Sequence, residues 1–216
     1  MNKDNRRNFI KKTAALSLAT GIMTSSPKPV QSNYILNQQV NGINIVGPKA
    51  GYTPEIGTLV SMMNWMRNTM LRPVHGMSQK DLDYLHDAKS NSIGAMLMHL
   101  VATERFYQEN TFEGSVHFEP GGDNDELYRA ASNLGDAGRA TFKGKELDYY
   151  LDKLEACREF SLKELAKYDD GWLEVVDTQF WGSPTNNYCK WFHVAEHESN
   201  HNGQIKYLKS RLHTNG

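Results

Sequence analysis

Four long segments of the chain repeat their apolar side chains every three to four residues, and this period constrains the fold more than any other feature. The clearest example is 54–72, whose apolar positions are Ile56, Leu59, Met63, Met66 and Met70. Such spacing places the side chains on one face of an α-helix. Comparable stripes occur in 92–110, 145–168 and 184–212. No segment suggests a sheet, so the sequence predicts an all-α protein.

Local sequence features place the ends of these helices and indicate how they connect. Thr53 precedes Pro54, a pair typical of a helix start, and Pro73 ends the first helix. Ser183-Pro184 marks the predicted start of the fourth helix. The glycine-rich connection 111–143 contains one short predicted helix at 125–133 and is long enough to cross a bundle of roughly 30 Å. The second and third helices can therefore run parallel, which predicts a four-helix bundle of up-down-down-up topology.

Residues 1–31 have the features of an export signal rather than of a folded domain. A basic start is followed by a short, weakly apolar run and then by Pro27 and Pro29. The segment Arg6-Arg7-Asn8-Phe9-Ile10-Lys11 resembles the twin-arginine export motif, and no cysteine follows the apolar run to carry a lipid anchor. We therefore predict a twin-arginine signal peptide at 1–31 and a periplasmic location.

Residues 32–51, between the predicted signal peptide and the bundle, carry no helical period. The Asn41-Gly42 pair is typical of a short hairpin, but an extended arm lying on the body fits the segment equally well. The bundle domain is therefore predicted over 52–213, after a short extended arm or hairpin.

Charge and cysteine content exclude several functional classes. The whole chain carries a net charge of −1, and the six basic residues and one acidic residue of 1–31 make that segment +5, which leaves −6 for the rest. An acidic body argues against a nucleic-acid-binding protein. No run of 18 apolar residues occurs, so no membrane span is predicted. Cys157 and Cys189 are too few for a disulfide scaffold and are interpreted as small buried residues, with a disulfide between them as the alternative.

The fourth predicted helix carries His193, His197 and His201, spaced four residues apart. Two imidazoles one turn apart on a core-facing stripe can bind one cation, and His197 and His201 are placed in this way. His99 on the second helix falls near the same level if the second and fourth helices run antiparallel. Three neutral imidazoles leave one coordination position open, as in catalytic metal sites. His193 could replace one of these ligands or line the pocket.

Two other metal motifs overlap the same residues. His197-Glu198-Ser199-Asn200-His201 has the H-E-x-x-H form of zinc proteases, but no acidic residue follows Glu198 as a third ligand. Glu198 and His201 also match half of a di-iron bundle site, although the chain has no second E-x-x-H. Both interpretations are therefore weaker than a three-histidine site.

Two motifs give the chain a resemblance to the DinB/YfiT-like superfamily. The segment Leu97-Met98-His99-Leu100, with Glu104 following, is similar to the second helix of that superfamily. The segment His197-x-x-x-His201-Asn202-Gly203-Gln204-Ile205 resembles its fourth-helix motif H-x-x-x-H-R-G-Q-I, with Asn202 where arginine is usual. The resemblance covers residues 52–212. It implies an up-down-down-up four-helix bundle in which His99, His197 and His201 bind a divalent metal ion.

The sequence therefore predicts an exported metal-dependent enzyme that acts on a small-molecule substrate. A divalent ion, Zn²⁺ or Ni²⁺, held by the three histidines would activate water, with Glu198 as the catalytic general base. Hydrolysis is favoured over the alternative, thiol S-transfer, because the usual thiol cofactors are cytoplasmic. A metal-binding or stress-associated bundle without catalysis is a further alternative. The superfamily includes dimers, so a homodimer is one expectation for the assembly.

Overall fold

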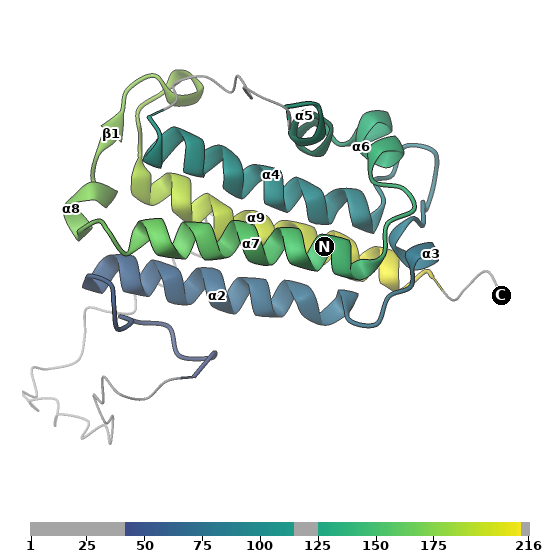
Figure 1. Ribbon diagram of the computed structural model, residues 1–216, viewed down its shortest axis with the longest axis horizontal. Helices are drawn as coiled ribbons and strands as arrows, with labels where there is room; N and C mark the ends of the chain where they lie inside the picture. The colour runs from purple at the N-terminus through teal and green to yellow at the C-terminus, as the bar shows by residue number, and fades with distance from the viewer. Residues whose placement is uncertain (1–41, 115–124, 213–216) are drawn as a thin grey trace, which may run out of the picture. The chain divides into compact units, whose positions relative to one another are not determined.

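Four long helices, each of about five to six turns, lie side by side and carry most of the buried surface (Figure 1). The computed structural model describes residues 42–114 and 125–212, all within one unit of the chain, Gln38–Gly216. The long helices are α2 (Pro54–Val74), α4 (Ile93–Phe112), α7 (Leu147–Leu165) and α9 (Asn187–Lys209). The prediction of an all-α protein is confirmed.

Shorter elements connect the long helices. They are α3 (Gln79–Leu82), α5 (Asp125–Asn133), α6 (Gly135–Thr141), α8 (Asp170–Leu173), the 3₁₀ turn η1 (Phe180–Gly182) and two strands, β1 (Val176–Asp177) and β2 (Thr185–Asn186). The two strands pair antiparallel over two residues each. Helix α6 was not predicted from the sequence, because its glycines were interpreted as loop residues. Gly138 instead allows close packing, since a Cβ there would lie 3.1 Å from the Ala130 carbonyl oxygen.

Contacts along the helices give their relative directions. The Lys209 ammonium, at the end of α9, donates a hydrogen bond to the Pro73 carbonyl near the end of α2. The Trp191 indole, near the start of α9, donates to Thr111 near the end of α4. Helices α2 and α9 therefore run in the same direction, and α4 runs opposite to α9.

The first residues of α9 depart from the predicted boundary. The helix was expected to begin at Ser183-Pro184, but Thr185 and Asn186 form strand β2, which pairs with β1. The Asn186 side chain then accepts a hydrogen bond from the Cys189 N–H and caps the helix. The segment 169–182 before it contains α8, β1 and η1.

The core consists of two apolar clusters with a polar layer between them. One cluster includes Met70 and Ile205, and the other includes Met63 and Trp191. Between these levels the buried side chains are charged: Arg67 on α2, Glu104 on α4, Arg158 on α7 and Glu198 on α9. Burying a charged group costs free energy unless the group is paired. Here each of the four long helices supplies one member of a paired cluster.

The described part of the N-terminal arm lies against α2. The Gly47 N–H donates a hydrogen bond to Ser61, and the Trp65 indole donates to Asn44. Gly57 permits this approach, because a Cβ there would lie 2.5 Å from the Lys49 nitrogen. Residues 42–51 contain turns but no strand. The predicted signal peptide and residues 32–41 lie outside the described residues.

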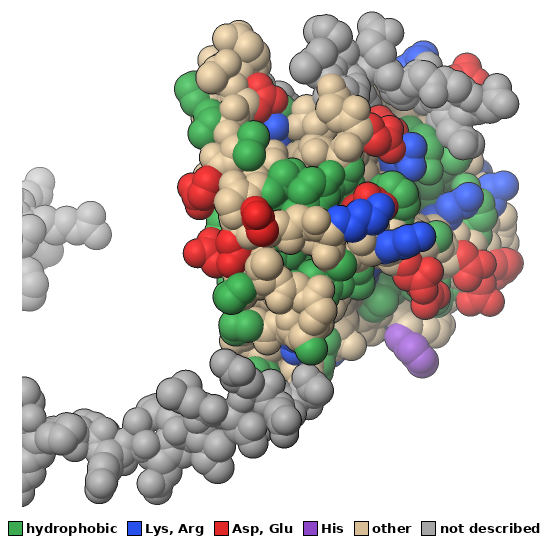
Figure 2. All heavy atoms as spheres, turned by 60° about the vertical axis from the view of Figure 1, so that its left-hand side comes forward, with side chains coloured by type: hydrophobic (Ala, Val, Ile, Leu, Met, Phe, Trp, Pro, Cys, Tyr) green, Lys and Arg blue, Asp and Glu red, His purple; other side chains and the backbone are tan. Residues whose placement is uncertain are grey.

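The surface near β1 mixes apolar and charged side chains. Val175 and Val176 are each 55% exposed there, and Figure 2, which brings this end forward, shows apolar groups among acidic and basic ones. Within 42–114 and 125–212, no helix has the length and apolar character needed to cross a membrane.

Candidate metal centre

The structure brings together the three histidines that the sequence singled out. His99 comes from α4, and His197 and His201 come from successive turns of α9. The Nε2 atoms of His99 and His197 are 2.9 Å apart, and the ring of His201 lies 5.0 Å from that of His99 between centroids. One ligand atom from each of the three residues lies within 4.8 Å of the other two. Three imidazoles in this arrangement can hold one metal ion.

The orientation of His99 is set by a helix that sequence analysis did not connect with the site. Its Nδ1 lies 2.9 Å from the carbonyl oxygen of Ala131 on α5. A carbonyl can only accept a hydrogen bond, so Nδ1 carries the proton and the Nε2 lone pair faces His197. This is the arrangement that a metal-binding imidazole needs, with the second nitrogen held by a hydrogen bond.

Burial keeps the three imidazoles neutral. Desolvation, followed by the neighbouring histidines, lowers the pKa of His197 to about 3. Desolvation and His99 lower the pKa of His201 to about 4, although the Gln204 side chain acts in the opposite direction. Desolvation also lowers the pKa of His99. Neutral imidazoles near pH 7 are the form that binds a metal ion.

One buried nitrogen of the cluster has no hydrogen-bond partner among the described residues. It is Nδ1 of His201, a residue only 5% exposed. An unpartnered buried polar atom costs free energy. A ligand at this position would remove that cost, so the donor set and its environment fit a bound metal ion.

A cavity of about 340 Å³ opens beside the cluster. His99 and His197 line it together with Ala102, Phe106 and Tyr107 and with the polar side chains of Thr103, Ser132 and His193. A molecule in this cavity would lie directly against two of the three imidazoles.

His193 lies at the edge of this cavity rather than in the three-histidine cluster. Its Nδ1 is 2.8 Å from the Tyr107 hydroxyl, and its ring centroid is 4.9 Å from that of His197. His193, Glu196 and His197 form a second group of close ligand atoms. Glu196 is more exposed than the members of the first group, so the first group is the better enclosed of the two.

Glu198, the predicted general base, lies in the polar layer of the core. Its Oε1 accepts hydrogen bonds from Arg67 at 2.7 Å and Arg158 at 2.8 Å, and its side chain is only 2% exposed. It belongs to neither group of close ligand atoms. The structure therefore does not bring Glu198 to the histidines, and its catalytic role stays a prediction.

Other residues around the centre escaped the sequence analysis or were only partly interpreted. Arg158 and Tyr107 were not singled out, although a charged residue within an apolar helical stripe is a sign of a buried ion pair. Glu104, named in the sequence only as part of the second-helix motif, accepts hydrogen bonds from both Arg67 and Arg158. Cys157 is buried and Cys189 is exposed, and both are free thiols, so the alternative of a disulfide between them is wrong.

The fold and the site together define an all-helical protein with a histidine cluster able to hold a metal ion. The sequence model of the mycothiol-S-transferase family matches residues 58–214. The chain therefore belongs to that family, which is a DinB/YfiT-like family. This agrees with the superfamily to which the two helix motifs pointed.

Comparison with solved structures gives a similar fold. A crystal structure of an uncharacterised protein from Clostridium difficile 630 matches with a TM-score of 0.56 and 15% identity, over 73% of this chain and 96% of that chain. At this identity the likeness concerns the fold alone. No curated protein matches the sequence.

Proposed function

We propose that the protein is a metal-dependent thiol S-transferase, with His99, His197 and His201 as the ligands of a divalent ion. The observation that carries the proposal is the convergence of three neutral imidazoles beside an apolar cavity in a chain of the mycothiol-S-transferase family. Water activation for hydrolysis, favoured from the sequence because the usual thiol cofactors are cytoplasmic, becomes the second candidate. The matched family is one of thiol S-transferases, and Oε1 of Glu198 accepts hydrogen bonds from two arginines.

The ion is proposed to be Zn²⁺ or Ni²⁺, both of which imidazole ligands suit. When bound, such an ion would act as a Lewis acid that lowers the pKa of a thiol substrate. The residues of the chain do the remaining work. The Ala131 carbonyl holds the His99 ring, and the polar layer around Glu198 holds the α9 backbone from which His197 and His201 project.

The cavity beside His99 and His197 is proposed to take the electrophilic co-substrate. Its surface is mainly apolar, with Ala102 and Phe106 among the side chains that line it. An aromatic or aliphatic electrophile bound there would have its reacting carbon near the histidine cluster. The thiol sulfur then forms a new C–S bond while the leaving group departs with its bonding electrons, and the thiol proton passes to solvent.

The test is conjugate formation between mycothiol and 1-chloro-2,4-dinitrobenzene, which releases chloride. The protein is assayed metal-free and after loading with Zn²⁺ or Ni²⁺, beside an ester and amide panel for hydrolysis. We expect metal-dependent conjugation that His197→Ala abolishes. Metal-dependent ester or amide cleavage without conjugation would support the hydrolase instead, and no turnover on any substrate would support a non-catalytic binding protein.

The four long helices are proposed to form an up-down-down-up bundle. The parallel course of α2 with α9 and the antiparallel course of α4 with α9 support it. So do the contacts of α7 with α4, which pair Tyr150 with Gly94 at one end and Ser161 with Gln108 at the other. This topology is what brings His99 to the level of His197.

Export and assembly are further parts of the proposal. The twin-arginine motif at Arg6-Arg7 supports transport to the periplasm. The net charge of −6 beyond residue 31 supports a small-molecule substrate rather than nucleic acid. A homodimer is proposed only from the superfamily resemblance.

A further inference from the structure

We propose that His193, Glu196 and His197 form an outer metal site, through which a divalent ion enters the three-histidine centre. One ligand atom from each of these residues lies within 4.8 Å of the other two. The proposal rests on the inner centre proposed above, but not on which reaction that centre performs. His193 and Glu196 have no part in the inner centre, so their arrangement calls for a separate explanation.

The three histidines of α9 pass from the surface of the protein into its interior. The side chains of His193 and Glu196 are 30% and 43% exposed, whereas His201 as a whole residue is only 5% exposed. The ring centroids of His193 and His197 are 4.9 Å apart, and those of His197 and His201 are 4.8 Å apart. A spacing of four residues on one helix places each ring about one turn beyond the last. Imidazole nitrogens therefore lie at every step between the solvent and the buried end of the centre.

Hydrogen bonds orient the side chains of the outer site for a cation. Oε1 of Glu196 accepts a hydrogen bond from the Asn200 amide at 3.3 Å, while Oε2 lies 3.9 Å from Nε2 of His193. That separation is too long for a hydrogen bond. It is close to the roughly 3.4 Å between two ligand atoms of one tetrahedral ion with bonds of about 2.1 Å. The Tyr107 hydroxyl, 2.8 Å from Nδ1 of His193, can accept a hydrogen bond from Nδ1–H, which leaves the Nε2 lone pair for the ion.

His197 belongs to both groups of close ligand atoms. An ion in the outer site can therefore move inward while it stays on the protein. It exchanges His193 and Glu196 for the other two imidazoles of the inner centre. The cavity of about 340 Å³ provides the space for this movement, because His99, His193 and His197 all line it.

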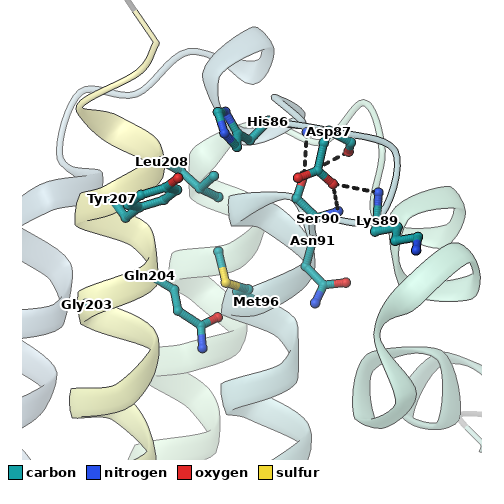
Figure 3. Close-up of a pocket in the computed structure, with 10 residues that line it drawn as sticks. All are labelled: His86, Asp87, Lys89, Ser90, Asn91, Met96, Gly203, Gln204, Tyr207 and Leu208. Carbon is teal, nitrogen blue, oxygen red and sulfur yellow. Dashed lines mark hydrogen bonds between the residues drawn. The ribbon is translucent and has the colours of Figure 1, made fainter.

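The larger cavity between 86–91 and the last turns of α9 offers no such route (Figure 3). It measures about 470 Å³, and none of the three clustered histidines lines it. Its carboxylate, Asp87, already accepts hydrogen bonds from the backbone N–H groups of Lys89 and Ser90. Among the described residues, Asp87 and His86 belong to no group of three close ligand atoms. Entry of the ion beside the outer site is therefore favoured.

The carboxylate of Glu196 gives the outer site a negative charge that the three inner imidazoles lack. Such a charge raises the local concentration of cations and can speed their association about tenfold or more. The outer site thus determines how fast an ion arrives. The affinity of the resting centre, in contrast, depends on its own three ligands.

The first experiment measures the rate of metal uptake by the metal-free protein. Co²⁺ is the probe, because its visible absorption reports on its ligands, and stopped-flow mixing gives the association rate. We expect His193→Ala and Glu196→Gln each to slow association about tenfold, with one ion per chain still bound at the end. Since the affinity is then unaltered, release of Co²⁺ to a chelator should slow by the same factor. His75→Ala and Glu159→Gln, at exposed positions on other helices, are the matched controls.

The second experiment detects the outer site directly by calorimetry with Zn²⁺. His99→Ala removes one inner ligand and leaves all three outer ligands in place. This variant should bind one Zn²⁺ more weakly than the wild-type protein, and a further His193→Ala should weaken that binding about tenfold or more. The same His193→Ala change in the wild-type background should alter the affinity by no more than about twofold. Circular dichroism establishes that each variant is folded.

Three outcomes would overturn the proposal. They are wild-type rates in both outer-site variants, equal slowing in the two controls, and Zn²⁺ binding to His99→Ala that His193→Ala does not weaken. A loss of wild-type affinity in His193→Ala would also overturn it, because His193 would then be a ligand of the resting centre.

Failure of the proposed function gives a different result. If the rates change as expected but the loaded protein transfers no thiol, the entry site stands and the transferase function fails. If the protein conjugates thiols and all variants load at the wild-type rate, the transferase function stands and the entry site fails.

Discussion

His99 and His197 are 98 residues apart in the chain, yet their Nε2 atoms lie 2.9 Å from each other. Two nitrogens at this distance must share either a proton or a cation. The Ala131 carbonyl accepts a hydrogen bond from the Nδ1–H group of His99. The Nε2 atom of His99 therefore presents a lone pair to His197. The relationship makes the histidine cluster the first place to test.

Removal of one proposed ligand should release the metal, whereas removal of its neighbour should not. His197→Ala is expected to lower bound Zn²⁺ or Ni²⁺ far below one ion per chain, because two imidazoles bind much more weakly than three. His193→Ala, which removes a ring in contact with His197 but outside the enclosed group, is the matched control. Inductively coupled plasma mass spectrometry after dialysis gives the stoichiometry. Equal losses of bound metal in the two variants would mean that the ligand set of His99, His197 and His201 is wrong.

The metal-free protein should lose stability as the pH falls below about 6.5. Unfolded histidine takes up a proton near that pH, whereas the folded pKa is about 4 for His201 and about 3 for His197. The unfolded state therefore binds more protons, and the free energy of unfolding decreases as the pH falls toward 4. Urea unfolding between pH 7 and 5, where few carboxylates titrate, measures the slope.

The double variant His197→Leu/His201→Leu is the control for this pH dependence. It removes the two histidines whose pKa is lowered most, so its free energy of unfolding should vary less over the same range, although His99, whose pKa is also lowered, remains. A slope equal to that of the wild-type protein would mean that other groups cause the acid sensitivity.

Glu198→Gln should destabilise the fold by about 3–5 kcal/mol, because two buried arginines lose the charge that they share. Glu196→Gln on the same helix is the control, since Glu196 is 43% exposed in its side chain. Urea denaturation gives the free energies, and metal content should stay near that of the wild-type protein. A variant of normal stability that binds metal but has lost turnover would restore Glu198 as the general base.

Two helical glycines should respond in opposite ways to alanine. A Cβ at Gly94 would lie 2.4 Å from the Tyr150 hydroxyl, which itself donates to the Phe142 carbonyl, so Gly94→Ala should cost about 1–3 kcal/mol. No atom lies within 4 Å of a Cβ at Gly203, so Gly203→Ala should stabilise α9 by about 0.5–1 kcal/mol. Thermal and urea unfolding compare them, and a loss at both positions would contradict the packing of α4 on α7.

The pair Arg6-Arg7 should control location without affecting the fold. Arg6→Lys with Arg7→Lys is expected to retain the protein in the cytoplasm, folded and metal-loaded, because a receptor reads the pair and the core of the described residues begins at Ile56. Cell fractionation followed by metal analysis of the purified cytoplasmic pool measures this. Normal arrival in the periplasm would indicate the general secretory route instead.

The helical class and the identity of the three clustered histidines could be derived from the sequence alone. The apolar period of 54–72 depends only on helix geometry, and the spacing of His197 and His201 places both near one face whatever surrounds them. His99 followed because the length of the 111–143 connection suggested how the helices run. These are local or nearly local properties, which a single sequence can express.

The contacts of each polar residue, in contrast, became known only from the folded chain. Glu198 follows His197 directly, but the 100° turn per residue points its carboxylate toward Arg67 and Arg158. The positions of these arginines along their helices relative to Glu198 could not be derived from the sequence. The start of α9 likewise depended on the pairing of Thr185 and Asn186 with β1. Which nitrogen of His99 carries the proton depended on a hydrogen bond to the Ala131 carbonyl, 32 residues away on a short helix. Contacts between distant segments depend on packing of the whole chain, and that is why periodicity identified the histidines but not the partners that orient them.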